Sequence, residues 1–321
     1  MSQISSSSNA SVLGATFMLG AGITFAITNV VTPIVTWQMG VPSTAVVFWQ
    51  YVIATIFFLP LILRIGLGNL KTRHPFWHET RALLSALGVQ FFAFGFALGV
   101  PVWQMVALSM TGPFFILIGA TLFLGEKLTP QRLGATITGF VGAVMVSQVG
   151  TEQFTLASLL PIIAAMCWGT VSVITKYLSR DEAPESMTLY MLVLITPNHF
   201  LIGLIIGLAV AVLPAGALPA ELATGFDFEL PVGDALGLIV LLGLVTAGAQ
   251  YFLSLSYKVA DATYLQPFDD LKLPLNTLLG WIVLSQVPAI WFWPGALLIL
   301  GASSFILWTE RRTAIARLQV A

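Results

Sequence analysis

Three charged side chains fall within four residues of an otherwise apolar stretch: Asp269, Asp270 and Lys272. Pro267 and Pro274 lie on either side of them and remove backbone N–H donors, so we expect the helix there to be kinked or interrupted. Buried carboxylates of this kind can bind a cationic group or a proton. Asp269 and Lys272 can instead neutralise each other as a structural pair. Even that interpretation leaves one carboxylate, that of Asp270, without a charged partner in this stretch.

The polar residues of this stretch share one helical face at 100° per residue. The face contains Gln266, Asp269, Asp270, Leu273, Asn276, Thr277 and Gly280. Lys272 flanks it within reach of Asp269. A polar stripe on an apolar helix is expected to face the protein interior. We therefore predict a substrate-binding or proton-coupling site there.

Polar side chains in other apolar stretches can complete this site. The candidates are Asn29, Gln104, Trp168, His199 and Gln250. His199 is an imidazole among apolar residues, where a partner is expected. Hydroxyl side chains such as Thr28 more often bond to their own backbone or to a neighbouring helix. His74 and His78 are expected to be solvated in a loop.

These residues lie on ten apolar stretches, each about long enough to cross a hydrocarbon layer of roughly 30 Å. The chain is 57% hydrophobic and only 8% charged, a composition that excludes an ordinary soluble domain. The expected spans are 12–32, 44–63, 82–100, 102–124, 133–149, 156–177, 188–213, 235–255, 262–284 and 290–308. The sequence thus predicts an all-α integral membrane protein with ten transmembrane helices.

Basic residues alternate between the loops. Twelve of the thirteen Lys and Arg residues fall in every second loop, and the thirteenth, Lys272, lies inside a span. The twelve are Arg64, Lys71, Arg73, Arg81, Lys127, Arg132, Lys176, Arg180, Lys258, Arg311, Arg312 and Arg317. Basic loops stay in the cytoplasm. Both termini are therefore expected in the cytoplasm, and the 214–233 segment is expected outside. The expected location is the cytoplasmic (inner) membrane.

Ten spans divide into two sets of five, which we place at residues 1–150 and 151–321. Because five is odd, the second set re-enters the membrane in the opposite orientation, and this is the inverted repeat of many secondary transporters.

The two halves carry motifs that resemble EamA-type members of the drug/metabolite transporter superfamily. In the first half these are Pro101-Val102-Trp103-Gln104, Pro113, Leu124-Gly125-Glu126 and Gly139-Phe140-Val141-Gly142. In the second half they are Asp261-Ala262, Pro267-Phe268, Gly280-Trp281 and Pro288. The resemblance implies a ten-span carrier of small organic metabolites that does not use ATP. One departure is Ser285-Gln286, where the family pattern has a second Gly-Glu, so Glu126 is expected to be structural.

We therefore expect a secondary transporter that works by alternating access. The carboxylates favour an amine-bearing amino acid or derivative as its substrate. The alternative is a polytopic membrane enzyme acting on a small or lipid-like substrate, but no motif of the common hydrolase, metalloprotease or nucleotide-binding classes occurs. A channel would need rings of equivalent groups, and Asp269 has no counterpart in the 102–124 span. Expected partners are a small-molecule substrate, membrane lipid and a second copy in a homodimer, with no nucleic acid, cofactor or metal.

Overall fold

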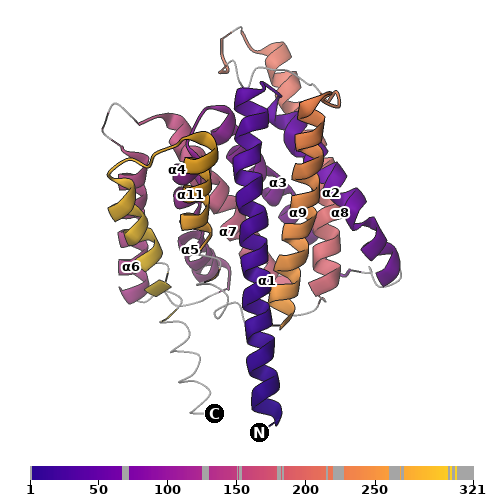
Figure 1. The fold of residues 1–321 in the computed structure, drawn as a ribbon, viewed down its shortest axis with the longest axis vertical. Helices are drawn as coiled ribbons and strands as arrows, with labels where there is room; N and C mark the ends of the chain where they lie inside the picture. The colour runs from indigo at the N-terminus through magenta and orange to yellow at the C-terminus, as the bar shows by residue number, and fades with distance from the viewer. Residues whose placement is uncertain are drawn as a thin grey trace.

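The computed structural model is a bundle of helices (Figure 1). It describes residues 2–66, 72–124, 130–149, 151, 154–178, 182, 184–214, 216–219, 228–259, 268, 271–302, 304–305 and 308. The long helices are α1 (Ser2–Pro33), α2 (Ser43–Ile65), α3 (Pro75–Ala97), α6 (Pro130–Ser147), α7 (Leu160–Leu178), α8 (Pro184–Val212) and α9 (Asp234–Val259). Shorter ones are α4 (Val102–Ser109), α5 (Gly112–Leu124), α11 (Lys272–Leu284), the π-helix Ile34–Gln38, the 3₁₀ turn Leu156–Leu159 and an apolar helix at Phe292–Ala302.

Long apolar helices and an apolar outer surface define an all-α membrane protein. Within the described ranges, seven helical segments are long and apolar enough to cross a membrane, and three shorter apolar helices accompany them. Large apolar side chains point outward, such as Leu122 at 72% exposure and Leu297 at 71%. Such exposure is costly in water but not in lipid. The expected fold class is confirmed, while the ten-span count stays a prediction.

Helices distant in sequence pack side by side. α1 lies along α9 and also contacts α11, while α3 packs on α7 and α8 (Figure 1). The largest core cluster joins α4, α5, α6 and α11 to the Phe292–Ala302 helix, with Phe114 and Ile299 fully buried. Helices of residues 1–150 and of residues 151–321 therefore share one core.

The described helices α5 and α11 each carry a proline in their first turn. The expected 102–124 span is two helices, because α4 ends at Ser109 and α5 starts at Gly112 with Pro113 as its second residue. α11 starts at Lys272 with Pro274 as its third residue. Both α5 and α11 are 13 residues long. Proline is tolerated in a first turn because its missing N–H has no helical partner there.

The described part of the charged stretch is the start of α11, at Lys272, with Pro274 in its first turn. That the two prolines kink or interrupt this helix stays a prediction, because Pro267, Asp269 and Asp270 lie outside the described residues.

Two glycines allow α6 and the Phe292–Ala302 helix to pack closely against each other. A Cβ atom on Gly142 would lie 2.6 Å from the carbonyl oxygen of Gly295, and one on Gly295 would lie 2.7 Å from that of Gly142. Only glycine on both helices permits this approach.

Candidate functional site

The buried face of α11 is the face expected from the sequence. Leu273, Asn276, Thr277 and Gly280 are the buried residues of this helix. The prediction is confirmed for these four residues. The other members of the stripe, Gln266, Asp269 and Asp270, lie outside the described residues. Lys272 is half-buried at the start of the helix.

An amide bridge joins α1 to α11 at this face. The Asn29 side chain donates from Nδ2 to Oδ1 of Asn276 at 3.0 Å. Asn276 in turn donates from its own Nδ2 to the carbonyl oxygen of Lys272 at 2.6 Å. The structure thus brings together three of the predicted site residues. The carbonyl lies in the first turn of α11, directly after the segment that holds the two carboxylates.

Thr28, beside Asn29, bonds to its own helix, as the sequence interpretation expected. Its Oγ1 donates to the carbonyl oxygen of Thr24 at 3.1 Å. Of these two neighbours, only Asn29 therefore makes a side-chain bond to another helix.

Gln104 and Trp168 are engaged elsewhere. Gln104 donates from Nε2 to the carbonyl oxygen of Val146 and to Oγ of Ser158, both at 3.2 Å. The Trp168 indole packs so closely on α3 that a Cβ on Gly88 would lie 2.6 Å from its Nε1. These contacts of Gln104 and Trp168 hold helices other than α1 and α11 together.

His199 is buried without the polar partner that the sequence led us to expect. It is 1% exposed, and neither ring nitrogen has a hydrogen-bond partner among the described residues. Its ring stacks on Tyr51 with centroids 5.0 Å apart. Gln250 is half-buried on α9, one turn after Thr246, which accepts from Nε2 of Gln50 at 2.8 Å. These groups lie between α2, α8 and α9.

A cap that sequence reasoning missed joins α11 to α4. The Gln286 side chain accepts a hydrogen bond through Oε1 from the backbone N–H of Val102 at 2.7 Å. Val102 begins α4, so this N–H has no partner within the helix. Ser285, just before, has the left-handed φ of 54° that glycine favours. The Ser285-Gln286 departure from the family pattern was the available signal.

A charged cluster that the sequence did not predict lies at the start of α3. His78 is fully buried, with Nε2 2.5 Å from Oε2 of Glu182, and Glu182 also accepts from the Thr72 hydroxyl. Arg81, 3% exposed, donates to the Met187 carbonyl and lies 3.4 Å from Nδ1 of His78. The expectation that His78 is solvated was therefore wrong.

Arg81 also departs from its expected place in a loop, because α3 begins at Pro75 rather than near residue 82. The spacing of His78 and Arg81, one helical turn apart, was visible in the sequence. Their partner Glu182, 104 residues beyond His78, was not.

Opposing influences set the acidity of Glu182. Burial is the largest single influence and raises the pKa of this carboxyl, but the hydrogen bonds from Thr72 and His78, the charge interaction with His78 and the hydrogen bond from the Arg73 backbone together lower it by more, so its pKa lies below the ordinary value. The carboxylate is therefore the stable form of this group in the folded protein.

Contacts between loops agree with the alternation of basic residues. Glu182, in one predicted cytoplasmic loop, contacts Thr72 and His78, which lie in or beside another such loop. Gln286 and Val102 join two loops that contain no basic residues. Trp49 similarly donates to the Phe228 carbonyl at 3.1 Å. Which end of the bundle is cytoplasmic stays a prediction.

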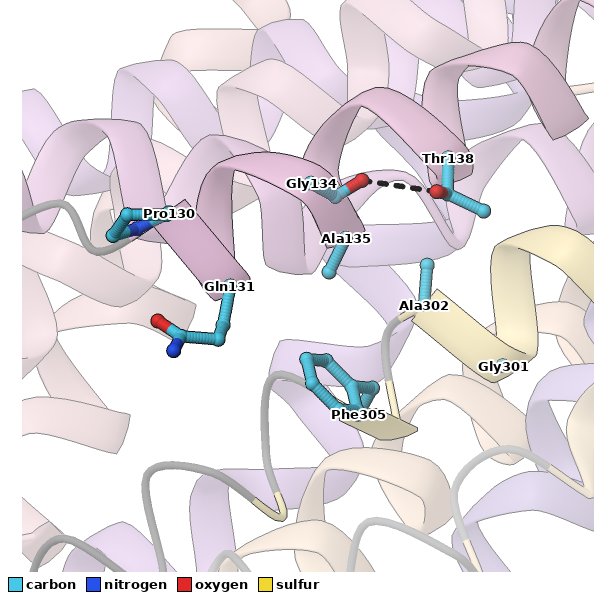
Figure 2. A pocket seen from close by; sticks show the side chains of 8 residues that line it. All are labelled: Pro130, Gln131, Gly134, Ala135, Thr138, Gly301, Ala302 and Phe305. Carbon is cyan, nitrogen blue, oxygen red and sulfur yellow. Dashed lines mark hydrogen bonds between the residues drawn. The ribbon is translucent and has the colours of Figure 1, made fainter.

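A groove of about 370 Å³ lies between α6 and the end of the Phe292–Ala302 helix. Figure 2 shows its lining of Pro130, Gln131, Gly134, Ala135, Thr138, Gly301, Ala302 and Phe305. Thr138 donates back to Gly134 of its own helix at 2.9 Å. None of the predicted site residues lines this groove, and its apolar wall suits lipid better than a polar solute.

A helical bundle with an apolar surface, an interruption between α4 and α5 and a partly buried amide bridge between α1 and α11 defines a multi-pass membrane protein of the transporter class. The sequence of the first half matches the EamA-like transporter family over residues 12–148.

Curated relatives extend this match over nearly the whole chain. A riboflavin transporter of Rhizobium johnstonii is 46% identical over 94% of this chain and 93% of its own length. A riboflavin transporter of Vibrio cholerae is 40% identical over 93% of this chain and 94% of its own length. An S-adenosylmethionine uptake transporter of Rickettsia felis is 28% identical over 84% of both chains. The chain belongs to the EamA-like transporter family and is a small-metabolite transporter rather than an enzyme.

A crystal structure of another protein shares the fold, with a TM-score of 0.57 and 18% identity, and the match covers 95% of this chain and 99% of the other.

Proposed function

We propose that this protein is a secondary transporter that moves riboflavin across the cytoplasmic membrane by alternating access. The observation that carries the proposal is the similarity of 40 to 46% identity, over more than nine-tenths of the chain, to proteins named riboflavin transporter. The loops predicted to be cytoplasmic, with both termini, would face the cell interior.

The chemistry of the α1–α11 bridge supports this substrate. Riboflavin is uncharged at neutral pH, and its ring system ends in an imide edge with two carbonyl acceptors around one N–H donor. A side-chain amide offers the complementary donor and acceptor. Asn29 and Asn276 satisfy each other in the structure. They would exchange that bond for the imide edge when substrate enters.

An amine-bearing metabolite is the second candidate. The sequence observation behind it is the Asp269-Asp270 pair, whose carboxylates suit an ammonium group better than a neutral ring. The relative named as an S-adenosylmethionine uptake transporter adds support, because that compound carries an amino-acid ammonium group. The two candidates differ in which side chains bind: amides for riboflavin, carboxylates for the amine.

The two-repeat division that we predict at residue 150 would suit alternating access. α5 follows the interruption after α4, and both α5 and α11 carry proline in their first turn. Interrupted helices at a repeat interface are where transporters of this design bind substrate.

Uptake into liposomes separates the two substrates. Purified protein should take up riboflavin, followed by its own fluorescence, and a hundredfold excess of S-adenosylmethionine should not compete. Asn29→Ala should reduce riboflavin uptake about tenfold, the loss expected for one or two hydrogen bonds of about 1 kcal/mol. Thr16→Val is the control on the same helix, because Thr16 bonds only to its own helix carbonyl at Val12. Full uptake by Asn29→Ala would contradict the amide site.

Neutralising the carboxylates tests the second candidate. Asp269→Asn and Asp270→Asn should abolish transport if the substrate is an amine or a coupling proton. If Asp269 only pairs with Lys272, the double change with Lys272→Met should restore both folding and transport. Full transport by that double variant and by Asp270→Asn alone would exclude a role of these carboxylates in binding.

Impermeant labelling tests the orientation. A cysteine at Ala223, in a Cys167→Ser background, should react in intact cells because the 214–233 segment is predicted to lie outside. Protection of that cysteine would overturn the orientation.

A further inference from the structure

The groove between α6 and the Phe292–Ala302 helix is separate from the residues assigned to substrate above. It has a volume of about 370 Å³, and five of its eight lining residues are glycine, alanine or threonine (Figure 2). A Cβ atom built on Gly134 or on Gly301 would have no packing partner among the described residues within 4 Å. The two helices therefore leave an open gap where larger side chains would have filled the space.

The groove starts at the end of the bundle and runs into its apolar part. It extends along α6 from Pro130 to Thr138, which is about 12 Å at 1.5 Å per residue. Beyond it, Gly142 brings the backbones of the two helices into contact, so the gap ends there. Leu133 and Ile137 on the same stretch of α6 are exposed, as expected for a surface that borders lipid.

The lining is apolar inside and polar at one end. Thr138 already donates its hydroxyl to the carbonyl oxygen of Gly134 at 2.9 Å, which leaves its methyl group to contact a ligand. Phe305 adds an aromatic ring (Figure 2). Gln131, next to Pro130, places a side-chain amide at the end of the groove (Figure 2). Such a lining matches an amphipathic molecule that has an apolar chain and a polar head.

The sequence around this polar end is basic. Residues 125–132 and 306–321 contain five basic residues against Glu126 and Glu310, so together they carry a net charge of +3. The five are Lys127, Arg132, Arg311, Arg312 and Arg317. α6 begins at this end, and the start of a helix also favours an anion. Both segments are predicted to be cytoplasmic, where the membrane leaflet carries anionic lipid. The charge at this end therefore complements a negatively charged head.

A second copy of the chain matches the groove less well. A 12 Å length of helix of about 10 Å diameter occupies on the order of 900 Å³, so a helix could insert only part of its width. Two copies that met here would also bring their basic segments together, and like charges repel. A soluble metabolite would lack the apolar chain that the lining is suited to contact.

We propose that this groove binds one anionic phospholipid, with an acyl chain between α6 and the Phe292–Ala302 helix and its phosphate at the start of α6. The bound lipid fills the lateral gap that Gly134 and Gly301 leave open. It also holds the basic segments at the membrane surface. The site is independent of which substrate the protein carries.

Native mass spectrometry on the purified full chain tests the class of lipid. The two probes are phosphatidylglycerol and phosphatidylcholine with the same dioleoyl chains, so they differ only in the head. One phosphatidylglycerol should be retained per protein, with a Kd at least tenfold lower than that of phosphatidylcholine. Glycerol phosphate has the charge without the chains and should not displace it.

Filling the groove tests the place of binding. The double variant Gly134→Leu with Gly301→Leu should raise the Kd for phosphatidylglycerol at least tenfold, because the new side chains occupy the space of the acyl chain. Both positions have room for a side chain, so the variant should keep its helix content and melting temperature. Gly237→Leu is the matched control, since this exposed glycine on α9 has equally open surroundings. It should retain phosphatidylglycerol as the unmodified protein does.

A measurement on the unmodified protein covers the case in which the double variant misfolds. Phosphatidylglycerol with a photoreactive diazirine on its acyl chain should label α6 and the Phe292–Ala302 helix. Labelling confined to other helices, equal retention of the two lipids, or undiminished retention by a folded double variant would each overturn the proposal. A double variant that keeps its lipid and loses a dimer would overturn it in favour of a second copy.

Discussion

The two ends of the helix bundle are tied by different chemistry. At one end the buried side chains of His78 and Arg81 lie with Glu182, whose Oε2 is 2.5 Å from Nε2 of His78. At the other end Gln286 caps α4 through a neutral amide. Neutral bonds respond little to pH, while buried charges depend on every proton nearby. The charged end is therefore expected to respond to pH, and the amide end is expected to stay bonded at all pH values.

Removing Arg81 should give the largest effect of the comparison. Arg81→Met leaves Glu182 buried without its cation, so the free energy of unfolding should fall by about 3 to 5 kcal/mol. Equilibrium unfolding in detergent micelles would measure this. The double variant Arg81→Met with Glu182→Gln should recover most of the loss because no unpaired charge remains. A loss below about 1 kcal/mol in the single variant would mean that the cluster is solvated.

Acid should weaken the charged end through Glu182. Its folded-state pKa lies below the ordinary value, so its contribution to stability is fully present above the unfolded pKa of about 4.3. That contribution is lost as the pH falls through the lower, folded-state pKa. The difference in melting temperature between the unmodified protein and Glu182→Gln should be constant near neutrality and vanish in strong acid. A difference that grows on acidification would reverse the assignment.

The amide end should give a smaller effect that does not depend on pH. Gln286→Met removes the acceptor for the Val102 N–H and should cost about 1 kcal/mol at any pH. Gln286→Glu keeps the acceptor and places an anion at a helix N-terminus, which is favourable. It should retain stability near neutrality and lose it in acid, giving this end the pH response of the other. Equal stability of Gln286→Met and the unmodified protein would show that water replaces the cap.

The bridge in the middle of the bundle should give the smallest effect. A double-mutant cycle of Asn29→Leu and Asn276→Leu should show a coupling of about 0.6 kcal/mol, the average for such bonds in membrane helices. Thermal unfolding measures the cycle. Additive effects of the two changes would mean that the bridge contributes nothing to stability, and its residues would then be free to serve substrate alone.

Sequence patterns predicted the elements well because they depend on local chemistry. Apolar runs placed most helices within a few residues, and the 100° rule found the buried face of α11. The start of α3 was missed by seven residues, since Pro75 begins the helix while the hydropathy signal begins only after Arg81. Hydropathy reports lipid contact, and a helix can begin before it meets lipid.

The sequence by itself determined that this chain is helical, apolar and embedded in a membrane, because composition and periodicity are properties of each segment alone. It also singled out Asn29 and Asn276, one in each half. Only the tertiary structure decided which polar groups meet: Asn29 with Asn276 across 247 positions, Val102 with Gln286 across 184, and His78 with Glu182 across 104. Such pairs leave no local trace, because their partners are chosen by how helices pack, and a buried polar group shows its role only when its partner is known.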